Sequence, residues 1–160
     1  MADVHNRTQR RRNMSAIRGR DTKPEVVLRR LLHRRGLRYR LHDTGLPGKP
    51  DLVFPQFNAV LFVHGCFWHQ HSNCKIASLP KTNVEFWTKK LSGNKERDFR
   101  NYRELVTSGW RVGVIWECAT RKKEFDLDRL VNNILGSDSW EIPEPFYKSS
   151  SLRVLSSELF

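Results

Sequence analysis

Three cysteines and a histidine have the types and the spacing of a metal site. Cys66, His71 and Cys74 fall within one nine-residue loop, and Cys118 follows a stretch, Trp110–Trp116, that we expect to be a strand. Thiolates and an imidazole at this spacing predict a closed Cys3His zinc site, which would be structural because the protein fills every position. An odd number of cysteines, in a chain whose N-terminus lacks the apolar segment of a signal peptide, argues against a disulfide framework.

Two alternatives stay open for this group. His64 and His69 are the rivals of His71 as the fourth ligand. Cys118 could instead be a buried core thiol, beside a loop that is merely rich in histidine.

A carboxylate and two histidines could do hydrolytic chemistry nearby. Asp51 heads an apolar strand, where a charge is costly unless it holds a cation or a hydrogen-bond network. The next strand ends in His64, so a hairpin can bring Asp51 to that end, and His69 follows. A carboxylate suits Mg²⁺, and a nearby histidine can deprotonate a water near pH 7. Glu25, on the first helix, could reach the same site through water.

This arrangement predicts a phosphodiester hydrolysis site. The alternative is that Asp51 only caps the turn after Pro50 and that His64 is a satisfied histidine at a strand end.

Large apolar side chains accompany these groups. Phe67 and Trp68 stand between two candidate ligands, Trp87 lies on the helix that opens at Thr82, and Met14 is surrounded by arginines. Exposed side chains of this kind can stack on bases or wedge into a groove. They could equally pack in the core or dock the N-terminal segment to the body.

Positive charge is concentrated at the start of the chain. The 160 residues hold 29 Lys and Arg against 17 Asp and Glu, a formal charge of +12. Residues 1–40 hold 13 of these cations against three acids, so they carry +10, and twelve of the 13 are arginine. We therefore expect residues 1–20 to be an arm that binds nucleic acid, with Arg12, Arg18 and Arg20 among its contacts. Ribosomal proteins, heparin binders and solvated faces can also be this basic.

The elements that must position these residues alternate between strands and helices. The expected strands are Leu37–His42, Asp51–Phe54, Asn58–His64 and Trp110–Trp116. The expected helices run from Thr22 to Gly36, from Thr82 to about Leu91, from Asn94 to Gly109 and from Asp126 to Leu135. This order predicts one α/β domain, a mixed sheet flanked by helices.

The chain divides into three parts. We expect the arm at residues 1–20, a core domain at 21–136 that holds the candidate phosphodiester hydrolysis site, with the zinc loop at 64–74, and a tail at 137–160 that shows no clear pattern. No apolar run approaches the ~20 residues of a membrane helix, so we expect a cytoplasmic protein without a membrane partner.

Four segments resemble the very short patch repair (Vsr) endonucleases. They are LPGKPDLVFPQFNAVLFVHGCFWHQHSNC, ending at Cys74, RNMSAIRGRDTKPE (Arg12–Glu25), TNVEFWTKKLSGNKERD (Thr82–Asp98) and GWRVGVIWECA (Gly109–Ala119). The block HGCFWH with the later WEC is the most specific part. The resemblance extends over roughly residues 1–135 and identifies the chain as a member of this family.

The resemblance implies a fold related to the PD-(D/E)xK restriction nucleases. It implies a nick in one strand, 5′ of the thymine in a T:G mismatch left by deamination of 5-methylcytosine, with a 5′-phosphate on the product. The implied cofactors are Mg²⁺, two ions, and one separate structural Zn²⁺. The (D/E)xK half of the motif is absent, and Val63-His64-Gly65 stands in its place.

The resemblance also implies catalytic roles for single residues. Asp51 matches a direct magnesium ligand, and Val63 matches a position that binds the metal through its backbone carbonyl. His69 matches a general base, His64 a contact to metal-bound water, and Glu25 a carboxylate that holds such water.

Other residues match binding positions of the family. The zinc ligands map to Cys66, His71, Cys74 and Cys118. The DNA contacts map to the major-groove aromatic wedge Phe67, Trp68 and Trp87, to Met14 in the minor groove, and to Lys90 and Asn94 on the mismatch side.

The partners that follow are double-stranded DNA with a T:G mismatch, a cytosine-5 methyltransferase linked in function and a mismatch-repair accessory protein. We expect a bacterial monomer, associated with the nucleoid when it is bound to DNA. Two other functions remain: a restriction-type nuclease that cuts unmismatched DNA, and a non-catalytic DNA-binding module stabilised by zinc.

Overall fold

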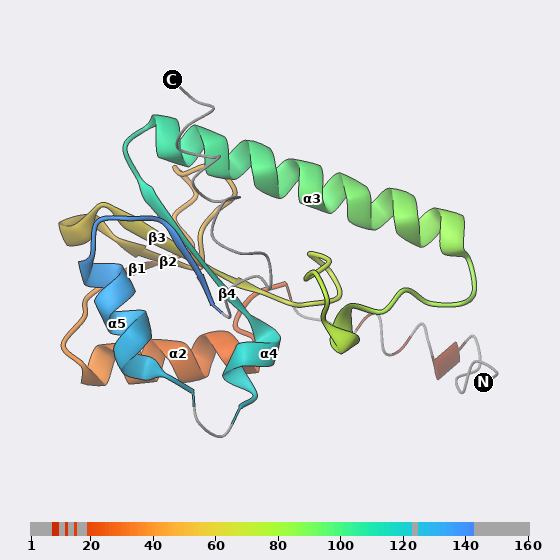
Figure 1. Ribbon diagram of the computed structural model, residues 1–160, viewed down its shortest axis with the longest axis horizontal. Coiled ribbons are helices and arrows are strands. Elements are labelled where there is room, and N and C mark those ends of the chain that lie inside the picture. Colours follow the sequence, from red (N-terminus) through yellow and green to blue (C-terminus); the bar gives the residue numbers. More distant parts are fainter. Residues whose placement is uncertain (1–7, 10–11, 13–14, 16–18, 123–124, 143–160) are drawn as a thin grey trace.

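The computed structural model describes residues 8–9, 12, 15, 19–122 and 125–142 (Figure 1). Met14, Arg18 and residues 143–160 lie outside this part, so the expectations for them are not addressed by the structure. Among the described helices, none is long and apolar enough to cross a membrane.

A mixed sheet forms the centre of the described part. Its strands lie in chain order: β1 (Arg40–Leu41), β2 (Leu52–Phe54), β3 (Ala59–His64), β4 (Arg111–Trp116) and β5 (Trp140–Ile142). The first three pair antiparallel, whereas β3–β4 and β4–β5 are parallel. The expected mixed α/β architecture is confirmed, and the relation to the restriction nucleases stays a prediction.

Helices cover both faces of this sheet (Figure 1). They are α2 (Lys23–Arg34), α3 (Val84–Thr107), α4 (Glu117–Thr120) and α5 (Leu127–Leu135). Successive side chains of β2 point to opposite faces of the sheet. Leu52 and Phe54 pack with α2 and α5, and Val53 packs on the side of α3. Burial on both faces explains why β2 and β3 are almost uninterruptedly apolar.

Helix α2 begins where the sequence predicts, and its first turn is held by the Glu25 side chain. The Thr22 side chain makes no capping bond to the backbone. Instead, the Glu25 carboxylate accepts from the Thr22 hydroxyl at 2.7 Å and from the Asp21 backbone N–H at 2.9 Å. Glu25 is thereby buried at the start of the helix, with only 3% of its surface exposed.

Two expectations about helices and strands were wrong. Helix α3 is continuous through Asn94, because Leu91 and Leu105 are nearly four turns apart and pack from the same side of one helix. The strand expected at Leu37–His42 is reduced to the two residues of β1.

Strand β5 lies in the stretch where the sequence shows no pattern. It pairs with β4 in parallel, and the Trp140 ring covers Gly113 so closely that a Cβ there would lie 2.2 Å from it. The Arg111 guanidinium, at the start of β4, donates to the carbonyls of Phe57 and Ile134 at 2.9 and 2.6 Å and so ties the turn before β3 to α5.

Candidate active site and metal centre

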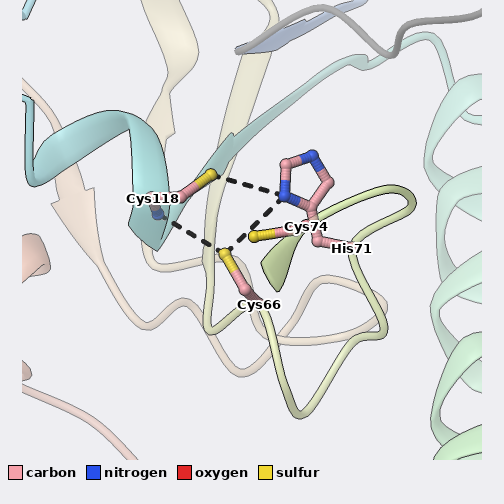
Figure 2. A group of neighbouring side chains, drawn as sticks. All are labelled: Cys66, His71, Cys74 and Cys118. Carbon is pink, nitrogen blue, oxygen red and sulfur yellow. Dashed lines mark hydrogen bonds between the residues drawn. The ribbon is translucent and has the colours of Figure 1, made fainter. Parts of the chain in front are cut away.

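The three cysteines and His71 come together at one end of the sheet (Figure 2). Their ligand atoms all lie within 4.8 Å of one another. His71 Nδ1 is 3.7 Å from Cys66 Sγ and 3.4 Å from Cys118 Sγ. A tetrahedral zinc-type site separates neighbouring sulfur and nitrogen ligands by about 3.6 Å, so these distances fit an ion at the centre.

The chemistry of the group also fits a bound cation. Burial raises the pKa of Cys66 to about 12, against the opposing hydrogen bond from the Cys118 backbone N–H, and burial likewise raises the pKa of Cys118. Without a cation these thiols therefore stay protonated, and S–H groups are weak hydrogen-bond donors. A metal ion would turn this set of weakly bonded thiols into thiolate ligands.

The parallel pairing of β3 and β4 explains the convergence. His64 and Trp116 are register partners at the ends of these strands, so the loop after β3 and the start of α4 meet there. Cys66 and His71 close a turn through the His71 N–H and the Cys66 carbonyl, at 2.9 Å. The His71 ring stacks on Trp116, with centroids 4.3 Å apart.

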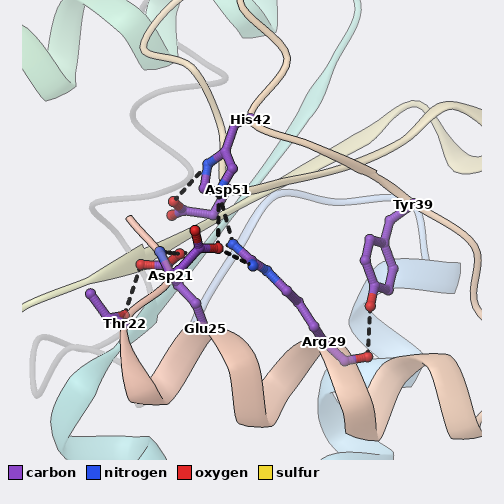
Figure 3. A network of polar contacts seen from close by, with 7 residues as sticks. All are labelled: Asp21, Thr22, Glu25, Arg29, Tyr39, His42 and Asp51. Carbon is purple, nitrogen blue, oxygen red and sulfur yellow. Dashed lines mark hydrogen bonds and ion pairs between the residues drawn. The ribbon is translucent and has the colours of Figure 1, made fainter. Parts of the chain in front are cut away.

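Asp51 lies beside the end of β3 (Figure 3). Its Oδ2 accepts the backbone N–H of Val63 at 2.7 Å, because the β2–β3 hairpin pairs the start of one strand with the end of the other. Its Oδ1 is 3.9 Å from Nδ1 of His42. Only 17% of the Asp51 side chain is exposed.

The electrostatics of Asp51 favour a cation. Burial, opposed by the Val63 hydrogen bond and reinforced by the neighbouring Glu25, raises the pKa of Asp51 from 3.8 to about 6. The ionised carboxylate is thus undercompensated, and a divalent ion would supply the missing positive charge.

We predict that Asp51→Asn stabilises the protein at pH 7 in buffer without Mg²⁺. A carboxyl whose folded pKa is raised opposes folding once it ionises, so the penalty is absent below about pH 4, grows up to about pH 6 and is complete above it. The expected gain in unfolding free energy at pH 7 is about 1–3 kcal/mol. Urea unfolding at pH 4 and pH 7 measures it, and an equal or lower stability at pH 7 would contradict the prediction.

Two histidines form a second polar group at the same end of the sheet. His64 and His69 stack with centroids 3.7 Å apart. His69 Nδ1 bonds Asp98 Oδ2 on α3 at 2.6 Å, and His64 Nε2 bonds the Tyr102 hydroxyl one turn further along that helix. His71 is therefore placed with the cysteines, and His69 with a carboxylate.

The two stacked rings have different surroundings. Burial, and secondarily His69, holds the pKa of His64 well below its usual value, so this ring is neutral. His69 is only partly buried. Its contact with Asp98 uses Nδ1, so Nε2 remains available to other partners. The pair therefore offers one buried neutral imidazole and one accessible imidazole paired with an acid.

The expected aromatic residues also gather into one group, which we call the aromatic cluster. Phe67 lies 5.1 Å from Trp68 and 5.3 Å from Trp87, between ring centroids. All three rings are partly buried. Asn94 is also partly buried, and its side-chain amide donates to the Trp68 carbonyl at 3.0 Å, which ties α3 to the loop that carries Phe67 and Trp68. Lys90, nearby on α3, is exposed.

Residues that the sequence did not single out complete these groups: Arg29, His42, Asp98 and Tyr102. Asp98 lies 29 residues after His69, and no local pattern links the two. Of the expected arm contacts, Arg12 and Arg20 are described and exposed.

An undercompensated buried carboxylate at the end of one strand, together with an accessible imidazole–carboxylate pair in the loop that follows the neighbouring strand, is the set of groups that a metal-assisted hydrolase of phosphodiesters needs. Comparison with known proteins makes this assignment specific. Residues 2–75 match the family described as DNA mismatch endonuclease Vsr.

Curated relatives agree. The DNA mismatch endonuclease Vsr of Escherichia coli K12 is 48% identical over 124 residues, which cover 78% of this chain and 79% of the relative. The type II nicking enzyme V.XorIIP of Xanthomonas oryzae is 48% identical over 118 residues, 74% of this chain and 86% of the relative. V.NmeAIP of Neisseria meningitidis, also a type II nicking enzyme, is 42% identical over 81% of this chain and 92% of its own length.

The chain therefore belongs to the Vsr family of DNA mismatch endonucleases, and it is a DNA-nicking hydrolase.

Proposed function

We propose that this enzyme nicks one strand of duplex DNA 5′ of the thymine in a T:G mismatch, in a reaction that requires Mg²⁺. The observation that carries the proposal is the meeting of Asp51 with the Val63 end of β3, beside the stacked His64 and His69. The family relationship supports a nick as the outcome.

Asp51 and the backbone carbonyl of Val63 would hold the magnesium. Bound there, Mg²⁺ would act as a Lewis acid on the scissile phosphate. The raised pKa of Asp51 supports this assignment, since it marks a carboxylate that needs a cation to ionise fully at neutral pH.

His69 is the proposed general base. Its Nδ1–H is committed to Asp98, which leaves Nε2 to accept a proton from the attacking water. The Asp98 carboxylate then stabilises the imidazolium that forms. His64, buried and neutral, keeps the His69 ring in place by stacking and can contact water at the site. Glu25 would hold metal-bound water on the α2 side.

The Cys66, His71, Cys74 and Cys118 group is proposed to hold one structural Zn²⁺. The four donors leave no open position, so the ion would not enter the reaction. It would instead tie the loop after β3 to α4 and thereby fix the aromatic cluster, which extends from this loop.

The aromatic cluster is the proposed wedge that unstacks the step beside the mismatch. We predict that Trp68→Ala lowers nicking of a T:G duplex about 10- to 100-fold, because one base-stacking contact contributes about 1–3 kcal/mol. The loss should appear in the ratio of T:G to T:A nicking, measured with labelled duplexes. Phe99→Ala, which removes a half-exposed ring of α3 outside the cluster, is the control. A selectivity ratio unchanged by Trp68→Ala would contradict the wedge.

The remaining proposals concern partners. The arm at residues 1–20 would hold the duplex by its phosphates, with Met14 entering the minor groove, so binding should weaken steeply with salt. The enzyme would act as a monomer in the bacterial cytoplasm. A cytosine-5 methyltransferase would act before it in the same process, and a mismatch-repair accessory protein would be a further partner.

One assay tests the function. End-labelled duplexes of one sequence, with a T:G or a T:A pair at the same position, are incubated with the enzyme in the presence or absence of Mg²⁺. We expect one nick, 5′ of the thymine, only in the T:G duplex and only with Mg²⁺. Denaturing and native gels together separate nicking from double-strand cutting.

Two results would overturn the proposal. Cutting of both strands in the T:A duplex would favour a restriction-type nuclease. Binding without cutting in every duplex would favour a zinc-stabilised binding module.

A further inference from the structure

On the α2 side of the candidate active site, three side chains of the kinds that bind metal ions surround an arginine instead of a metal ion. Ligand atoms of Asp21, Glu25 and His42 all lie within 4.8 Å of one another, an arrangement that suits a divalent cation. The Arg29 guanidinium lies among them: Nη1 is 2.5 Å from Asp21 Oδ1, and Nη2 is 2.9 Å from both Glu25 Oε2 and His42 Nε2 (Figure 3).

The guanidinium determines the orientation of the His42 ring. Arginine only donates hydrogen bonds, so Nε2 of His42 must be the acceptor in this contact. The proton of the neutral ring therefore sits on Nδ1, the atom that faces Asp51 Oδ1 at 3.9 Å. Arg29 thus directs an N–H dipole at the carboxylate.

The backbone around this arginine is unusual. Asp21 and His42 both adopt left-handed conformations, with φ of +55° and +46°, which side-chain-bearing residues seldom occupy. Such strain is concentrated at functional sites. In addition, the Tyr39 hydroxyl donates to the Arg29 carbonyl at 2.8 Å, and only 12% of the Arg29 side chain is exposed.

We propose that Arg29 is a built-in cation: it takes the place of a divalent ion among Asp21, Glu25 and His42, and through His42 it positions Asp51. The claim that Arg29 positions Asp51 rests on the proposed role of Asp51 as a metal ligand. Arg29 is then a positioning residue, which leaves Asp51 and Val63 as the side of the site open to Mg²⁺.

Nuclear magnetic resonance tests the orientation in the unmodified protein. Long-range ¹H–¹⁵N correlation on protein with ¹⁵N-labelled histidine identifies the protonated ring nitrogen at pH 8, and His42→Gln assigns the signals. We expect the proton on Nδ1 of His42. A proton on Nε2 would overturn the proposal without any variant of Arg29.

Metal counting tests the built-in cation. Mn²⁺ alone is titrated calorimetrically into Asp51→Asn and into the double variant Asp51→Asn/Arg29→Met. We expect the double variant to bind about one Mn²⁺ per chain more than the single one, because the vacated donors suit this ion. A folded double variant that gains no site would overturn the proposal. This count does not depend on whether Asp51 is catalytic.

Kinetics test the positioning role. We expect Arg29→Met to lower kcat about 10- to 100-fold with the KM for DNA unchanged, the size of effect usual for groups that orient metal ligands. Arg29→Lys should recover part of kcat, since an ammonium keeps the charge but not the fork of donors. Unchanged kcat in Arg29→Met would overturn the positioning role, as would no recovery in Arg29→Lys.

The matched control is Arg121→Met. Arg121 pairs with Glu117 at the same i, i+4 spacing as Arg29 with Glu25, but on the exposed side of α4. We expect Arg121→Met to keep the kcat of the unmodified enzyme and, when added to Asp51→Asn, to keep the number of Mn²⁺ ions that Asp51→Asn binds. If circular dichroism shows that Arg29→Met does not fold, the position of the His42 ring proton in the unmodified protein and the kcat of Arg29→Lys decide whether the proposal holds. If Asp51→Asn itself kept full nicking activity, the proposed function would fail, while the ring protonation and the Mn²⁺ count would still decide whether Arg29 is a built-in cation.

Discussion

Asp51→Asn is expected to nick a T:G duplex about 10³-fold more slowly than the unmodified enzyme, or slower still, because it removes the charge proposed to hold Mg²⁺. Asparagine keeps the shape of the side chain and can still accept the Val63 N–H. The local fold should therefore persist. Single-turnover nicking at saturating enzyme, measured over a series of Mg²⁺ concentrations, gives the rate of the chemical step.

The stability of this variant separates loss of chemistry from loss of fold. The same substitution is expected to raise the unfolding free energy at pH 7, so a slow Asp51→Asn enzyme cannot be explained by unfolding. Asp128→Asn, which removes a largely exposed carboxylate from α5, is the control and should keep the full rate. Full nicking by Asp51→Asn would show that the catalytic assignment is wrong.

Cys118→Ser is expected to have the largest effect on stability. The unmodified protein should contain about one zinc ion per chain, and the variant less, because a hydroxyl is a poor zinc ligand. Loss of the ion should lower the unfolding free energy by about 3 kcal/mol or more, since binding to a structural site adds directly to folding. Elemental analysis and thermal unfolding measure the two effects.

A variant in the same loop serves as the control. Ser72 is exposed and lies between His71 and Cys74, so Ser72→Ala should keep both the zinc content and the melting temperature. A Cys118→Ser protein that is free of zinc and as stable as the parent would contradict a structural role for the ion. Full zinc content in this variant would contradict Cys118 as a ligand.

Several features could be predicted because they depend on neighbours in the chain. Cys66, His71 and Cys74 fall in one short loop, where few backbone arrangements keep their side chains apart. The approach of Asp51 to Val63 follows from a tight hairpin between two apolar strands. Cys118 is different: it lies far along the chain, and the parallel pairing of β3 and β4 in the structure brings it to the loop.

Other features could not be read from local pattern. Gly93-Asn94 resembles a helix boundary, but a continuous α3 buries Leu91 and Leu105 on one side, and that packing outweighs the propensity of two residues. Strand β5 has only three residues, too few for a periodic signal, and it forms because β4 offers it a free edge.

The sequence by itself therefore determined the family, through the resemblance of four segments to known members, and it determined the α/β class and the residue types of both candidate sites, since these follow from composition and short-range spacing. Only the tertiary structure decided the partners: Asp98 for His69, Tyr102 for His64, and Arg29 among the donors that include His42. The reason is physical. These contacts depend on which side of α2 and α3 packs against the sheet, and that is set by burial of the whole domain, not by any segment of it.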